Sequence, residues 1–229
     1  KAIAKNSLEY QPRDRWGYSL CHDVLAGLVE VATGVRFSEY VQKNIFDKLG
    51  MKDSYYHIND EIKPRMAALY VHNSEDGHTY VRDLKNDYVV GTEYDSGGAG
   101  LISCVDDQIL LADALTHLGM GKSGNRILSS YGVNLMRTNA LNEVQYKTFN
   151  NTLHVRGYGY GYGVRTNMHP EDSGNIMPLG EFGWDGAKLS YISSCPETGI
   201  SIFHAEHMGA LHGTVIPRLR NIIYSCLDD

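Results

Sequence analysis

Two hydroxyl-bearing residues, Tyr18 and Ser19, stand just ahead of a predicted helix in the stretch RWGYSLCHDVLAG. Enzymes often hold reactive side chains at the start of a helix. Ser19 is also a residue type that caps the first turn of a helix with its side-chain oxygen. Tyr18 can bury its ring and keep its hydroxyl at a cleft, and a packed ring with a satisfied hydroxyl is the structural alternative.

Three other kinds of site find little support in the sequence. A Ser-His-Asp hydrolase needs G-x-S-x-G, whereas Ser19 lies in GYSLC, which lacks the second glycine. His204 and His207 stand three residues apart at an expected strand end, where their rings point to opposite faces, so we expect no metal site. In GYGYGYG, Tyr162 occupies the third glycine position of the dinucleotide fingerprint and no P-loop lysine follows, so we expect no cofactor.

The composition is that of a globular protein. The chain has 229 residues, of which 42% are hydrophobic and 21% are charged. Its net charge of −6 argues against a nucleic-acid partner, because phosphate binding needs a basic surface. The sequence has no apolar run near the roughly 18 residues that a membrane span requires.

The four cysteines are expected to be buried free thiols. No two of them form a C-x-x-C pair, and each lies in an apolar stretch; they are Cys21, Cys104, Cys195 and Cys226. Free thiols favour a reducing compartment, which points weakly to the cytoplasm, and the sequence leaves the compartment otherwise open.

Apolar spacing of three and four residues predicts five helices, at 19–33, 38–49, 103–118, 130–137 and 213–227. Serines are expected to cap the first three, namely Ser19, Ser38 and Ser103, and glycines to end them. In the second helix the residues expected to face inward are Val41, Ile45, Phe46 and Leu49. In the last helix they are Ile216, Leu219, Ile222, Ile223 and Cys226.

Alternating and β-branched runs predict strands in the second half of the chain and a hairpin in the first. The runs 66–73 and 79–83 flank the turn signal SEDG, and the runs 187–194 and 200–206 flank CPETG. The alternation in 157–163 indicates a strand whose glycines allow another backbone to approach closely. Consecutive antiparallel strands with helices on their faces define an α+β fold.

Three segments, taken together, resemble the serine β-lactamase and penicillin-binding-protein superfamily, in the branch of class C β-lactamases, family VIII-type esterases and D-aminopeptidases. Residues 16–54 resemble its stretch from the Tyr-x-Asn element to the "PLGM" helix end. Residues 96–115 (SGGAGLISCVDDQILLADAL) resemble its Gly-Gly-x-Gly-Leu segment, and residues 182–202 (FGWDGAKLSYISSCPETGISI) its Lys/His-Thr-Gly strand. The resemblance implies a β-lactamase/transpeptidase-like fold over 1–229 as a single domain.

The resemblance also implies acyl transfer by a serine and a lysine in an S-x-x-K motif. Tyr18 matches the tyrosine that works with the lysine to take the serine proton, and Ala187 supplies a backbone N–H of the oxyanion hole. Trp184, Asp185 and Gly186 match the substrate-binding Lys-Thr-Gly element.

Two departures bear on the substrate. The family's Tyr-x-Asn is Tyr18-Ser19-Leu20 here, and its Lys-Thr-Gly is Trp184-Asp185-Gly186. An indole and an acid cannot favour a carboxylate-bearing substrate, and Asp185 would repel one if it faced the cleft. The sequence therefore favours neutral small-molecule or peptide esters and amides over β-lactams.

A third departure is larger, because no serine of the chain is followed three residues later by lysine. We therefore interpret the chain as the C-terminal portion of a serine hydrolase, without its nucleophile helix and first strands, and inactive by itself. Such a portion should expose a strand edge and apolar surface, which predicts self-association or a missing N-terminal segment. The alternative is a non-catalytic relative that binds a ligand or a partner protein.

Overall fold

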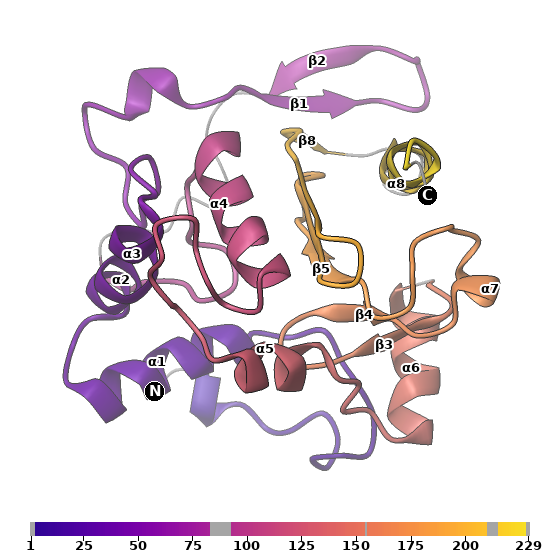
Figure 1. The fold of residues 1–229 in the computed structure, drawn as a ribbon. Helices are drawn as coiled ribbons and strands as arrows, with labels where there is room; N and C mark the ends of the chain where they lie inside the picture. Colours follow the sequence, from indigo (N-terminus) through magenta and orange to yellow (C-terminus); the bar gives the residue numbers. More distant parts are fainter. Residues whose placement is uncertain (1–2, 83–92, 154, 210–214, 228–229) are drawn as a thin grey trace.

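A five-stranded antiparallel sheet, in the order β3-β4-β5-β6-β7, forms the centre of the protein (Figure 1). The computed structural model describes residues 3–82, 93–153, 155–209 and 215–227. The strands are β3 (Tyr158–Tyr160), β4 (Arg165–Asn167), β5 (Phe182–Asp185), β6 (Tyr191–Cys195) and β7 (Ile200–His204). Each neighbouring pair is antiparallel, which confirms the predicted α+β architecture.

Two helices cover the two faces of this sheet, α4 (Val105–Thr116) on one and α8 (Val215–Ser225) on the other (Figure 1). Alternate residues of β6 serve the two faces, as the period of two in a strand requires. The Ser194 hydroxyl donates to the Ala112 carbonyl of α4 at 2.9 Å. On the other face, Tyr191 packs in one buried cluster with Ile216 and Tyr224 of α8.

A second core lies between α4 and the helical segment 37–49. This segment consists of α2 (Phe37–Val41), a π-helical turn (Gln42–Phe46) and α3 (Asp47–Leu49). Val41, Phe46 and Leu49 are buried against Ala114, which confirms the predicted inward face. The segment ends at a left-handed glycine, as predicted.

The predicted hairpin is confirmed as β1 (Leu69–His72) and β2 (Thr79–Arg82), and β8 (Met208–Gly209) extends it in parallel with β1. The shorter helical elements are η1 (Ile3–Lys5), η3 (Lys63–Arg65), α5 (Ser130–Arg137), α6 (Glu143–Leu153) and α7 (Pro170–Ser173). The sequence predicted α5 but not α6, in which Phe149 is the fully buried side chain. None of the helices described is long and apolar enough to cross a membrane.

The three predicted serine caps are wrong. The residues at the cap positions are Leu20, Arg36 and Cys104, and none of them caps through its side chain. The Ser19 hydroxyl lies 2.8 Å from the Cys21 thiol, and the Ser103 hydroxyl instead bonds across the fold to Ser54. At Ser103 a tertiary hydrogen bond thus takes the place of the local cap, whereas the Ser19 hydroxyl contacts a side chain only two residues away.

The inward face of α8 also differs from the prediction. Ile216 is buried as expected, but Ile222 is 62% exposed and Cys226 is exposed. The buried residues of α8 are Ile216, Arg220 and Tyr224, which are four residues apart. The spacing of apolar residues does not predict a buried arginine at position 220. It is buried because it has an anionic partner in the sheet.

The cysteines are all free, but only Cys195 is buried. Cys104 is half-buried, while Cys21 and Cys226 are exposed, so the expectation of buried thiols is wrong for these two. Their surrounding apolar residues belong to helix faces that the structure leaves partly uncovered.

One such face belongs to α1 (Cys21–Thr33), which lies across the end of the molecule near α5 (Figure 1). Its apolar stripe is exposed, and we define the α1 face as Leu20, Val24, Leu28 and Val31, with exposed fractions of 61%, 46%, 56% and 85%. Ala26, on another side of the helix, is buried. An uncovered apolar stripe of this length confirms the exposed apolar surface expected from the sequence.

Candidate active site

The structure brings Tyr18 and Trp184 together from distant parts of the chain. Their rings stack with 6.4 Å between centroids and 25° between planes. Trp16 approaches Tyr18 edge-on, at 6.1 Å. Tyr18 itself is 67% exposed, so its hydroxyl is open to solvent beside the end of β5.

Tyr160 of β3 completes this aromatic group and was not singled out from the sequence. Its ring centroid lies 5.4 Å from that of Trp184 and 5.6 Å from that of Trp16. Burial, with a smaller effect of Tyr18 and Cys21, raises the pKa of Tyr160 to about 12. Tyr160 therefore stays protonated at neutral pH, so it can donate a hydrogen bond or pack its ring against the site, but it does not act as a base.

A glycine-rich loop holds the first turn of α1, directly after Tyr18. Asp23 accepts hydrogen bonds from the Ser96 hydroxyl at 2.6 Å and the Tyr94 hydroxyl at 2.8 Å. Any side chain at Gly97 would collide with the backbone carbonyl of His22. The glycine is required because the two backbones touch, and the contact fixes where Tyr18 enters the helix.

Asp95, between Tyr94 and Ser96, anchors the same end of the loop, and its side chain is fully buried. Its carboxylate accepts from Arg36 at 2.9 Å, from the Ser38 amide at 2.7 Å and from His57 at 2.6 Å. Burial alone would raise the pKa of Asp95, but these hydrogen bonds outweigh it and lower the pKa to about 2. No local pattern in the sequence indicates this cluster, because its members come from three separate segments.

The turn between β5 and β6 presents the backbone of Ala187. The predicted strand 187–194 is wrong at its start, because residues 187–190 form this turn. The Gly186 amide donates to the Ser190 carbonyl at 2.6 Å, and the Leu189 amide to the Gly186 carbonyl at 3.0 Å. Within the described part of the chain the Ala187 amide has no hydrogen-bond acceptor. An exposed, unpaired N–H of this kind is suited to bind an oxyanion.

Asp185 points away from Tyr18. It follows Trp184 in β5, so the two side chains lie on opposite faces of the sheet. Its carboxylate accepts from Arg220 of α8 at 3.1 Å and lies 3.8 Å from the Arg165 guanidinium. Asp185 would repel a substrate carboxylate only if it faced the cleft, and it does not. Of Trp184, Asp185 and Gly186, it is therefore Trp184 that lies beside Tyr18.

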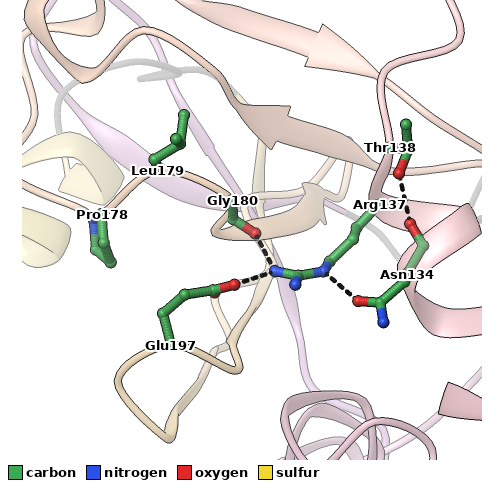
Figure 2. A pocket seen from close by; sticks show the side chains of 7 residues that line it. All are labelled: Asn134, Arg137, Thr138, Pro178, Leu179, Gly180 and Glu197. Carbon is green, nitrogen blue, oxygen red and sulfur yellow. Dashed lines mark hydrogen bonds and ion pairs between the residues drawn. The ribbon is translucent and has the colours of Figure 1, made fainter. Parts of the chain in front are cut away.

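Figure 2 shows a hollow at the other end of the sheet, lined by Asn134, Arg137, Thr138, Pro178, Leu179, Gly180 and Glu197. Arg137 fills its centre, with an ion pair of 2.7 Å to Glu197 and a hydrogen bond of 3.2 Å to the Gly180 carbonyl (Figure 2). Gly180 precedes β5, whereas Trp184 lies near the end of that strand. The hollow is therefore separate from the Tyr18 region.

The two histidines that the sequence places three residues apart have ordinary partners. His204 contacts Glu206 at 2.8 Å, and the His207 ring contacts the Ala67 carbonyl at 3.0 Å. One group of possible ligand atoms, from His169, Glu171 and Asp172, is gathered within 4.8 Å on the exposed surface of α7. All three residues are exposed, and among the described residues no buried side chain hydrogen-bonds to theirs, so their grouping does not indicate a metal centre.

The family of the chain follows from a match to a family model. The Beta-lactamase model matches residues 1–205, and the chain therefore belongs to this family. Its fold is that of a β-lactamase/transpeptidase-like protein.

Curated relatives agree with this assignment. Protein Rv1367c of Mycobacterium tuberculosis is 27% identical over 213 residues, which cover 89% of this chain and 51% of that protein. A Salmonella gallinarum protein named as a D-alanyl-D-alanine carboxypeptidase is 28% identical over 131 residues, covering 51% of this chain and 30% of the relative. The chain spans about half the length of the first of these relatives and less of the second.

Solved structures share the fold. EstCE1, a hydrolase with promiscuous acyltransferase activity, superposes with a TM-score of 0.80 at 20% identity, over 97% of this chain and 59% of its own. Simvastatin synthase (LovD) from Aspergillus terreus superposes with a TM-score of 0.81 at 22% identity, over 93% of this chain and 56% of its own. At such identities the likeness concerns the fold.

Proposed function

We propose that residues 1–229 supply part of the acyl-transfer site of a serine hydrolase that acts on neutral esters or amides. The observation that carries the proposal is the apposition of Tyr18 and Trp184 beside the turn that presents the Ala187 amide. Family membership supports a serine hydrolase, and both EstCE1 and LovD carry names that refer to acyl transfer or synthesis.

Each proposed role follows from simple chemistry. A serine hydroxyl is a weak nucleophile and needs a neighbouring base. A tyrosine phenol, with an ordinary pKa near 10, becomes that base when a nearby ammonium favours its phenolate. Tyr18 is the phenol of this proposal, and the Ala187 N–H donates to the oxyanion that forms when the serine attacks.

The proposed substrate is uncharged around the scissile carbonyl. The indole of Trp184 stands where the β-lactam-binding members of the family have a cation, and Asp185 is turned towards Arg220. Tyr18, Tyr160 and Trp184 present ring surface and hydroxyl groups to this space. Such a surface favours an apolar acyl group over a carboxylate.

The serine and lysine must come from polypeptide outside residues 1–229, since no S-x-x-K occurs within them. Tyr18 lies three residues before α1 and two before Leu20, the first residue of the α1 face, so a lysine that reaches its hydroxyl would lie near one end of this face. We propose that the segment carrying the nucleophile covers the α1 face. This would bury the four exposed apolar side chains and complete the site in one step.

Labelling with a fluorescent phosphonate tests the proposal. The chain of residues 1–229 should remain unlabelled, and the protein that also contains the preceding coding sequence should be labelled. Labelling of residues 1–229 alone would overturn the account of the nucleophile. If the longer protein is not labelled either, the proposal that it is a serine hydrolase is rejected.

The absence of an S-x-x-K from the sequence supports one other function, a non-catalytic protein that binds a ligand or a partner through the same aromatic site. The two proposals differ in the preceding coding sequence. An S-x-x-K there supports the hydrolase, and a reading frame without it supports the binding protein.

A further inference from the structure

Asp185 is the half-exposed member of a charge cluster that is otherwise buried. The side chains of Arg165 and Arg220 are 5% and 8% exposed, and Glu181 is fully buried. Glu181 lies 3.0 Å from Arg165, while the carboxylate that contacts Arg220 is that of Asp185, at 3.1 Å. Two cations and two anions thus balance, and Asp185 is the anion that neutralises Arg220 within the described residues.

Aromatic rings hold this cluster against the sheet. The Arg220 guanidinium lies 4.3 Å from the centroid of the Tyr191 ring, and Arg165 lies 5.2 Å from it. Tyr191 stands directly opposite Asp185 in the β5–β6 ladder. Arg220 also donates to the Tyr158 hydroxyl at 3.2 Å. Asp185 is therefore held by the guanidinium groups of Arg165 from β4 and Arg220 from α8.

The other side of the β5–β6 turn is fixed as well. Leu189 has a φ of 71°, in the left-handed region that branched side chains rarely adopt, and its side chain is 2% exposed. The Lys188 carbonyl accepts a hydrogen bond from the Met208 amide. Burial of Leu189 and the link to β8 secure the far end of the turn, and Asp185 secures the near end.

We infer that Asp185 is a positioning residue rather than a substrate contact. Arg220 and Arg165 hold its carboxylate on the α8 face of the sheet. Because neighbouring strand residues point to opposite faces, this directs Trp184 towards Tyr18, and it fixes the start of the turn that carries Ala187. A role of Asp185 in catalysis rests on the proposed function, whereas its effect on the orientation of Trp184 and Ala187 does not.

The test is the Asp185→Asn variant of residues 1–229, measured by NMR. We expect the indole N–H signal of Trp184 and the amide signal of Ala187 to shift, and the Gly186 amide to exchange at least tenfold faster. The Glu197→Gln variant is the matched control, because Glu197 is 42% exposed, Asp185 is 47% exposed, and each pairs with a more buried arginine. It should leave all three signals unchanged.

Two further variants keep the test decisive. Asp185→Glu restores the charge and should return the Trp184 signal towards that of the unmodified chain, which a loss of general stability would not predict. Arg220→Met combined with Asp185→Asn removes the unpaired buried cation, so it should fold even if Asp185→Asn alone does not, and should show the same local changes. Unchanged Trp184 and Ala187 signals in both asparagine variants would overturn the inference. Failure of phosphonate labelling would reject the hydrolase without altering these signals.

Discussion

The ring of Tyr18 stacks on the ring of Trp184 with 6.4 Å between their centroids. One residue precedes the exposed helix α1 and the other lies in a central strand of the sheet, so their contact joins the two halves of the candidate site. The stacking leaves the Tyr18 hydroxyl accessible. Removing that hydroxyl should therefore lower the rate of acyl transfer without changing the stability of the fold.

Tyr18→Phe should reduce acyl transfer by a factor on the order of 10² to 10⁴ in the longer protein that carries the nucleophile, because proton transfer to a positioned group contributes about that much. The free energy of unfolding should change by less than about 0.5 kcal/mol, since the side chain is largely exposed. Acylation rates with a phosphonate and chemical denaturation measure the two quantities. Tyr162→Phe is the control, because Tyr162 is 64% exposed and makes none of these ring contacts. Equal losses in both variants would argue against a special role for Tyr18.

Two glycine substitutions should have opposite effects on stability. Gly97→Ala places a methyl group against the His22 carbonyl and should destabilise the fold by about 1–3 kcal/mol, as overpacking does. Gly27→Ala lies within α1, has no atom within 4 Å of the added carbon, and should stabilise the helix by about 0.5–1 kcal/mol. Thermal or urea unfolding compares the two. A neutral Gly97→Ala would contradict the close packing of the loop on α1.

Asp95 should make stability depend on pH in the acid range. Its folded-state pKa of about 2 lies below the usual value of 3.8, so its contribution is complete above about pH 4 and disappears as the pH falls towards 2. Asp95→Asn should lower the free energy of unfolding by on the order of 2 kcal/mol at pH 7, and it should weaken the dependence of stability on pH between 2 and 4. Urea titrations between pH 2 and 7 provide the measurement. Glu9→Gln, in an exposed pair with Arg15, should change stability by less than about 1 kcal/mol at any of these pH values.

The α1 face should cause residues 1–229 to self-associate when no other segment covers it. The double variant Leu28→Gln with Val31→Gln should reduce this association, because both side chains are exposed and apolar. Its stability should change by less than about 1 kcal/mol, since glutamine is a good helix former. Sedimentation velocity measures the association. Ile176 and Leu179, which are 57% and 63% exposed, serve as controls. An effect of their glutamine variants as large as that of the α1 pair would assign association to another surface.

The sequence predicted those features that depend on local spacing and on motif order. Left-handed glycines end the helices at Gly34 and Gly50, because only a residue without Cβ adopts that conformation at little cost. The turn signals of the hairpins and the inward residues of 38–49 were equally local. The resemblance of three segments correctly gave the family and the antiparallel α+β fold.

Tertiary structure decided which polar groups are partnered and which apolar faces are covered. The burial of Arg220 depends on Asp185, and the pKa of Asp95 depends on three segments, so neither is visible in any one stretch of sequence. The Ser103 cap was wrong because the distant Ser54 hydroxyl competes with the backbone for the Ser103 hydroxyl. Amino-acid order by itself determined that Tyr18 stands before an amphipathic helix, while the packing of the chain decided that its ring meets Trp184 and that the stripe of α1 lies open. Periodicity defines a face, but whether a face is buried depends on what packs against it.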